Sequence, residues 1–156
     1  MINYRIAGIN DAPELKRLND LFNGEDCNTL DDIEESLKHN EHELVCVAAN
    51  GSNLVGFCCG QIFKSMCYPI YCAEITELFV MDDFRRQGIG KSLLQFTEDI
   101  LINRGVKHFH VLTGDKNTAA QALYRSRGYA DTNEILLDKF TIFHSQAFRT
   151  GCLPEH

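Results

Sequence analysis

A short glycine-containing loop between a predicted strand and a predicted helix constrains this chain more than any other feature. Residues 73–81 (AEITELFVM) have the composition of a strand, and residues 92–104 (SLLQFTEDILINR) have the spacing of an amphipathic helix. The connection between them ends in Arg85-Arg86-Gln87-Gly88-Ile89-Gly90-Lys91. The glycines permit a sharp bend and a close ligand approach, while the helix start and three basic side chains favour an anion. The loop therefore predicts a phosphate-binding site.

Two common nucleotide-binding loops do not fit this stretch. A Walker loop requires G-x-x-x-x-G-K-[ST], and Gly90-Lys91-Ser92 matches its end, but Phe84 or Arg85 stands where the first glycine should be. A dinucleotide-binding loop requires G-x-G-x-x-G, and Leu93 stands in place of its third glycine. Both interpretations are disfavoured, so the nature of the phosphate ligand has to come from the rest of the chain.

The remaining patterns predict strands and helices in the order β-α-α-β-β-β-loop-α-β-α-β. Upstream of the loop, strands are predicted at residues 2–6, 43–49 and 54–64, and helices begin after Asn10 or Asp11 and at Thr29. Asn50-Gly51, between two apolar runs, is a strong hairpin signal. Downstream, the pattern predicts a strand at 106–113, a short helix at 117–127 and a strand toward the end of 129–140. We therefore expect an α/β (α+β) fold with a mostly antiparallel central sheet and helices on both faces.

Composition excludes several classes of protein. A length of 156 residues fits one domain, in which we expect residues 141–156 to form either a mobile tail or a short extra element. No apolar run is long enough to cross a membrane, and no secretory signal is visible at the N-terminus. A net charge of −7 argues against nucleic-acid binding. One basic loop in an acidic protein suits an anionic cofactor and a cationic substrate.

The cysteines and histidines predict no metal and no catalytic thiol. The seven cysteines are odd in number and lack C-x-x-C spacing, so we interpret them as free, mostly buried thiols in a reducing cytoplasm. No pattern places a histidine beside any of them. His108 and His110 alternate on a predicted strand, where surface or edge positions are expected, and no third ligand accompanies them.

Two segments together resemble the GCN5-related N-acetyltransferases. Arg85-x-x-Gly88-x-Gly90 is similar to the Q/R-x-x-G-x-G/A signature of that family. The segment Asn117-x-x-Ala120-x-x-Leu123-Tyr124-x-x-x-Gly128-Tyr129 resembles the family's N-x-x-A-x-x-L-Y-x-x-x-G-F/Y segment. The likeness covers about residues 73–130, and the order of predicted elements extends it toward the N-terminus.

The resemblance implies acetyl-CoA as the acetyl donor, with its pyrophosphate on the backbone N–H groups of residues 86–91. It implies that the pantetheine arm runs along the strand that carries Leu78, Phe79 and Val80. It implies further that Asn117 hydrogen-bonds the pantetheine region and that Tyr124 lies near the thioester sulfur as an acid. Asn117 is equally explained as a helix N-cap, and Tyr124 as a core aromatic residue.

Two carboxylates of the central strand are candidates for the base that deprotonates the amine. Glu74 corresponds in spacing to the base of the histone-acetylating members, and Glu77 to an acidic residue of the aminoglycoside 3-N-acetyltransferases, to which the loop bears a weaker likeness. Regular alternation puts the two on opposite faces, although a β-bulge would alter that count. Our preference is Glu77, and Glu74 remains open.

The sequence therefore predicts an acetyl-CoA-dependent N-acetyltransferase that acts on a primary amine of a small molecule, with an aminoglycoside as one candidate. Direct attack on the thioester needs no covalent enzyme intermediate. The alternatives are a peptide or protein acetyltransferase and a non-catalytic acyl-CoA-binding domain. Oligomeric state is open, with a homodimer common among relatives.

Overall fold

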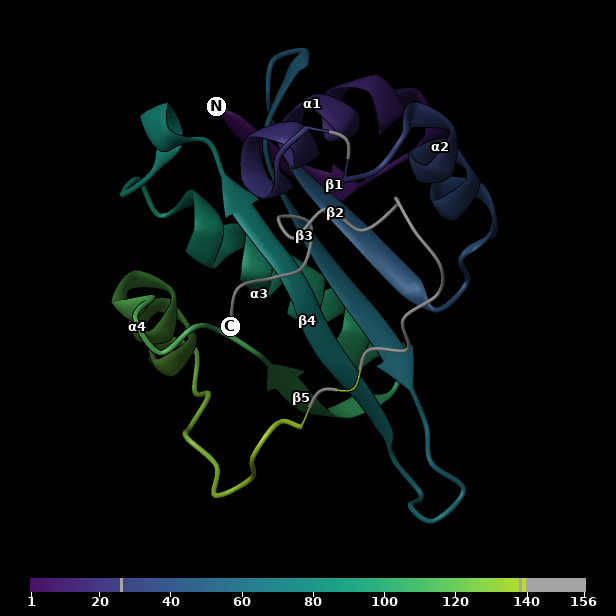
Figure 1. Ribbon diagram of the computed structural model, residues 1–156, viewed down its shortest axis with the longest axis vertical. Helices are drawn as coiled ribbons and strands as arrows, with labels where there is room; N and C mark the ends of the chain where they lie inside the picture. Colours follow the sequence, from purple (N-terminus) through teal and green to yellow (C-terminus); the bar gives the residue numbers. More distant parts are fainter. Residues whose placement is uncertain (26, 138, 140–156) are drawn as a thin grey trace.

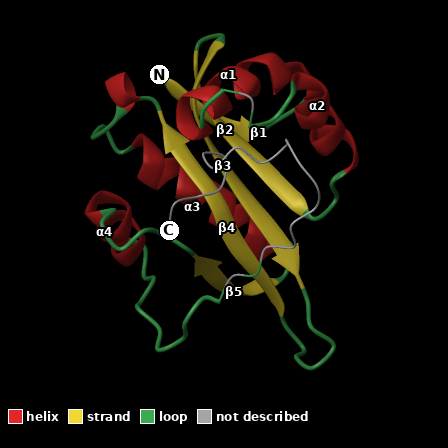
Figure 2. Cartoon of the chain, viewed as in Figure 1, coloured by secondary structure: helices red, strands yellow, loops and turns green. Residues whose placement is uncertain are grey.

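Five strands form one sheet, in the order β1-β2-β3-β4-β5, with helices on both sides (Figures 1 and 2). The computed structural model describes residues 1–25, 27–137 and 139. Its strands are β1 (Ile2–Ile6), β2 (Glu43–Asn50), β3 (Asn53–Phe63), β4 (Tyr71–Val80) and β5 (Val106–Val111). Its helices are α1 (Ala12–Asn23), α2 (Leu30–His39), α3 (Ile89–Asn103) and α4 (Thr118–Ser126), with short 3-10 turns η1 (Ile9–Asp11) and η2 (Asp82–Phe84). The predicted mixed fold is confirmed.

Three of the four strand pairs are antiparallel. The predicted hairpin is present, because Asn50 pairs with Asn53 across the turn that contains Gly51, whose φ is +63°. Thr29 caps α2 as predicted, since its hydroxyl oxygen accepts from the Asp32 N–H at 3.1 Å. Among the strands of the described residues, only β4 and β5 run parallel, and the crossover through α3 joins them. The first four strands are therefore antiparallel neighbours in chain order, and the last strand, β5, follows α3 and runs parallel to β4.

Helices pack on both faces of the sheet. On one face, Leu93, Leu94 and Leu101 of α3 pack on strand residues such as Cys46 and Ile75. On the other face, α1 and α2 pack on a second cluster that includes Val47, Phe57 and Phe79. In Figure 1, α3 passes behind the strands while α1 and α2 lie over the upper part of the sheet. We call these the α3 face and the α1/α2 face.

A β-bulge in β4 changes which side chains share a face. Glu77 pairs with Cys59 and Ile75 pairs with Gly60, so Thr76 is an extra residue on β4. Its hydroxyl donates to the Cys59 carbonyl at 3.4 Å. Ile75 and Leu78 both pack on the α3 face, which leaves Glu74 and Glu77 together on the opposite side. The bulge that the sequence left open is therefore present, and the expectation of opposite faces is wrong.

Two further expectations need correction. The described residues of 129–140 form no strand, because Ile135 and Leu137 are each 84% exposed and the apolar run there does not alternate. Cys27 is not a free thiol, whereas Cys46, Cys58, Cys59, Cys67 and Cys72 are free. Cys152 and the segment 141–156 lie outside the described residues. None of the described helices is long and apolar enough to span a membrane.

Candidate active site

The predicted phosphate loop lies on the surface between η2 and α3. The first helical hydrogen bond of α3 runs from the Ser92 N–H to the Gly88 carbonyl at 3.0 Å. The N–H groups of Ile89, Gly90 and Lys91 precede it and have no acceptor inside the helix. Gly88 has a φ of +79°, a left-handed conformation that suits glycine. The loop therefore leaves backbone N–H groups without helical acceptors at the place where the sequence predicts an anion.

The side chains of the loop serve different purposes. Arg85 is held in place, because its Nε donates to the Val80 carbonyl at 2.9 Å and its guanidinium pairs with Asp82 at 2.8 Å. Ile89 is 4% exposed and packs on the α3 face, so only its backbone can meet a ligand. Gln87 donates to the Asp83 carbonyl at 3.1 Å. Arg86 and Lys91 are exposed and remain the cations best placed for a phosphate.

Next to this loop, β4 has a free backbone edge. Its pairing with β5 ends at Ile75 and Val111, although β4 continues to Val80. Leu78, Phe79 and Val80 pair with β3 on their other side and direct their side chains into the two cores. Their backbone groups on the β5 side are left without a strand among the described residues. An extended ligand could add to this edge as a strand does.

The second predicted segment forms α4 and brings Tyr124 to the same region. Asn117 is the N-cap, and its Oδ1 accepts from the Ala120 N–H at 3.1 Å, which leaves its amide NH₂ available. Tyr124 is 8% exposed and belongs to the core of the α3 face. Arg127, at the end of α4, pairs with the buried carboxylate of Glu98 on α3 at 2.5 Å and so holds α4 against α3.

Tyr124 and Glu77 interact electrostatically. Burial raises the pKa of the Tyr124 phenol, and the nearby groups of Cys58 and Glu77 raise it further. Burial likewise raises the pKa of the Glu77 carboxyl, and the charge of Glu43 adds to the effect. A phenol that stays protonated and a carboxyl with a raised pKa are suited to donate and to accept a proton. Their position beside the free edge of β4 makes this region the candidate active site.

Sequence reasoning missed one member of this region. Glu43 begins β2 and lies on the α1/α2 face, as the neighbouring Val45 and Val47 do. Together with Glu74 and Glu77 it gives that face three carboxylates, on the two strands that flank β3. Only the pairing of β2, β3 and β4 reveals the group, since Glu43 is far from the other two in the chain.

Another expectation is overturned at the start of β4. Cys72 pairs in register with His108, so the structure places a histidine beside a cysteine, contrary to the sequence-based interpretation. Burial raises the pKa of Cys58 to about 12, and that of Cys59 well above its ordinary value, so those two thiols are not nucleophiles at neutral pH.

Comparison with known proteins covers most of the chain. The model of the acetyltransferase (GNAT) family matches residues 12–129. An uncharacterised N-acetyltransferase of Chlorobaculum tepidum is 31% identical over 109 residues, which are 70% of this chain and 66% of that protein. The match thus spans about two thirds of the length of that relative.

Two solved structures share the fold. One is an aminoglycoside acetyltransferase from an uncultured soil metagenomic sample, in complex with sisomicin, with a TM-score of 0.79 and 21% identity over 91% of this chain and 97% of that one. The other is a ribosomal-protein-alanine N-acetyltransferase from Brucella melitensis, with a TM-score of 0.74 and 18% identity over 90% of this chain and all of that one (100%). At these identities the likeness establishes the fold, and the two names point to different acceptors.

Proposed function

Because the chain belongs to the acetyltransferase (GNAT) family, whose members are N-acetyltransferases that use acetyl-CoA, we propose that it acetylates a primary amine of a small polycationic molecule. The observation that carries the proposal is the group of Glu43, Glu74 and Glu77 on the α1/α2 face, of which Glu77 lies in the part of β4 that has no β5 partner. Negative charge at this place favours an acceptor with several ammonium groups.

The described residues fit acetyl-CoA. The N–H groups at the start of α3, with Arg86 and Lys91, would hold the pyrophosphate. The backbone of residues 78–80 would pair with the pantetheine arm, and the free amide of Asn117 would donate to it. This arrangement would direct the thioester along β4 toward Tyr124 and Glu77.

The chemistry requires a proton acceptor and a proton donor. An amine attacks a thioester only when it is neutral, so a base must remove a proton from the ammonium form. Glu77 is the proposed base, because its raised pKa brings it closer to neutral pH than an ordinary carboxyl. Tyr124 is the proposed donor to the leaving sulfur, since burial keeps its phenol protonated.

A second candidate acceptor is a protein N-terminus, supported by the name of the Brucella neighbour. Thiol release from acetyl-CoA, measured with an acceptor panel, separates the candidates. The panel contains sisomicin, a linear polyamine, lysine and a peptide with an N-terminal alanine. We expect acceleration by the polycationic small molecules. Preference for the peptide would move the acceptor to protein, and binding of acetyl-CoA without acceleration by any amine would favour a non-catalytic domain.

A cytoplasmic location and a homodimer remain predictions from the sequence and the resemblance. Size-exclusion chromatography with light scattering would measure the mass in solution and decide the second of these.

A further inference from the structure

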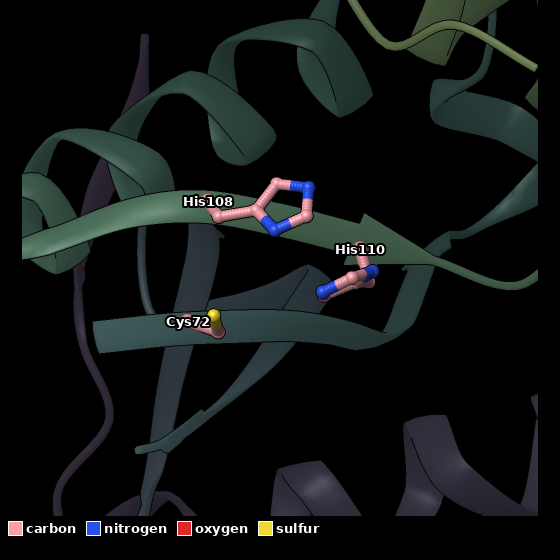
Figure 3. Close-up of side chains that lie close together, drawn as sticks. All are labelled: Cys72, His108 and His110. Carbon is pink, nitrogen blue, oxygen red and sulfur yellow. The ribbon is translucent and has the colours of Figure 1, made fainter. Parts of the chain in front are cut away.

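Three potential metal ligands, Cys72, His108 and His110, lie close together on the neighbouring strands β4 and β5 (Figure 3). Cys72 comes from β4, and His108 and His110 come from β5. One ligand atom of each, the cysteine sulfur and a ring nitrogen of each histidine, lies within 4.8 Å of the others. Figure 3 shows the three side chains close together on two neighbouring strands.

The register of the parallel pair places the three side chains on one face. Cys72 pairs with His108, and the next pair, Ala73 and Phe109, packs on the α3 face. His110 is two residues beyond His108 and therefore points the same way as His108. Cys72 and His110 are half-buried and His108 is exposed, so an ion from solvent can reach them. The backbone thus fixes a constellation that chain order alone does not show.

The donor set suits a zinc-class cation. A thiolate and two imidazoles are soft and borderline ligands, which such ions prefer to carboxylates. Around a tetrahedral zinc these atoms lie roughly 3.3–3.6 Å apart, so rotation of the side chains is enough to close the site. The rings of His108 and His110 are already 4.3 Å apart at their centroids, and Phe63 stacks on His110 at 6.0 Å. Phe63, at the end of β3, is thus a neighbour of the His110 imidazole.

We propose that Cys72, His108 and His110 bind one zinc-class divalent cation, with water as the fourth ligand. On binding, the thiol of Cys72 loses its proton to solvent and its sulfur bonds to the metal. The site joins β4 to β5 in the segment where they are still paired. Cys72 lies roughly 15 Å along β4 from Glu77, at about 3.3 Å per residue, whereas Glu74 pairs in register with His110 and lies beside the site. The metal therefore clamps the two strands next to Glu74.

Zinc binding is testable on untagged, chelator-treated full-length protein. Calorimetric titration with ZnCl₂ should show one ion per chain. At a free zinc concentration one hundred times the dissociation constant, Tm should rise by roughly 5–10 °C. Co²⁺ as a probe should give a thiolate charge-transfer band. Cys72→Ser should abolish the band. Each of the variants Cys72→Ser, His108→Gln and His110→Gln should weaken zinc binding at least about tenfold.

Two matched controls distinguish the site from other cysteines and histidines. Cys67→Ser and His39→Gln change an exposed cysteine and an exposed histidine outside the cluster, and both should bind zinc like the unmodified protein. In the unmodified protein, zinc should slow alkylation of Cys72, mapped by mass spectrometry, while Cys67 reacts at the same rate. Zinc binding that survives Cys72→Ser unchanged, or equal alkylation of Cys72 with and without zinc, overturns the proposal.

Discussion

Glu77 couples the proposed chemistry to the stability of the fold. The pKa of its carboxyl is raised by burial and by Glu43. In the unfolded chain the carboxyl has its ordinary pKa of 4.5, so as pH rises the unfolded state loses this proton before the folded state does. The contribution of Glu77 to the free energy of unfolding therefore falls as pH rises from about that ordinary value to the raised one. Above both values the carboxylate destabilises the fold.

Replacing Glu77 by glutamine should accordingly have opposite effects on activity and stability. We expect Glu77→Gln to lower kcat by about 10²-fold or more, because the base is lost. The pH profile of kcat/KM should also lose the acidic limb that the Glu77 pKa produces. At pH 7 the Tm should rise, and the rise should disappear at a pH below 4.5, where the carboxyl is protonated in both states.

Glu74→Gln is the matched control for that substitution, since Glu74 lies on the same face of β4. We expect it to raise KM for a polycationic acceptor and to leave the acidic limb in place. Kinetics and thermal melts of the two variants across pH decide the assignment. If Glu74→Gln removed the limb and Glu77→Gln kept it, the base would be Glu74.

Tyr124 is the second residue whose environment suits proton transfer. Removing only its hydroxyl, in Tyr124→Phe, should lower kcat by about 10²-fold if it donates to the leaving sulfur. The dissociation constant for acetyl-CoA should change much less, because the ring keeps its place in the core and its edge-on contact with Tyr129. Calorimetry with acetyl-CoA and steady-state kinetics measure the two quantities. Unchanged turnover would remove the donor role.

At the scale of elements, the start of α3 depends on the left-handed conformation of Gly88. A Cβ at this position meets no atom within 4 Å, so a substitution is opposed by backbone strain and by no clash inside the chain. Asparagine and aspartate tolerate this conformation better than other residues, and they are nearly the same shape. They therefore separate charge from strain at one position.

We expect Gly88→Asn and Gly88→Asp to lose a similar stability, about 1 kcal/mol. Gly88→Asp should weaken acetyl-CoA binding at least about tenfold more than Gly88→Asn does, because it adds a negative charge beside the proposed phosphate. Thermal melts and calorimetry measure the two effects. Equal affinities in the two variants would show that the pyrophosphate lies elsewhere.

At the scale of the whole molecule, charge is distributed unevenly. The net charge is −7, yet the loop before α3 is basic and the α1/α2 face carries Glu43, Glu74 and Glu77. This separation favours the approach of an anionic donor at one place and a cationic acceptor at another.

Salt should therefore reduce activity toward polycationic acceptors. At an ionic strength of 0.1 M the Debye length is about 10 Å, and it shortens as salt is added. Raising ionic strength from low values to well above 0.1 M should therefore lower kcat/KM several-fold for a polyamine and less for a monoamine. Initial rates at saturating acetyl-CoA check this. Equal salt dependence for both amines would argue against recognition of the acceptor by the carboxylates of the α1/α2 face.

The features that the sequence predicted well are those fixed by neighbouring residues. The Asn50-Gly51 hairpin, the Thr29 cap and the loop before α3 each depend on a few adjacent side chains. The features that it left open or missed depend on pairing between distant segments. The bulge at Thr76 is set by the register of β3, and the approach of Cys72 to His108 is set by the parallel pair.

The failure at residues 129–140 has a different cause. Apolar residues occur there, and composition alone favours a strand. A strand also needs a partner edge and an alternating pattern, and Ile135, Leu136 and Leu137 are consecutive. Residues 130–136 instead line a hollow of about 1110 Å³ with β5 and α4.

The extra residue at Thr76 gives β4 one residue more than its pairing with β3 requires. An in-frame loss of that one codon would restore strict alternation through β4 and leave every remaining side chain on its present face. Cys72, Glu74 and Glu77 would stay on one side, while Ala73, Ile75 and Leu78 would still face α3. Such a deletion would remove the hydrogen bond from the Thr76 hydroxyl to the Cys59 carbonyl and the local kink of the strand. In descendants of this gene, loss of Thr76 should therefore be tolerated more readily than loss of a core residue of β4.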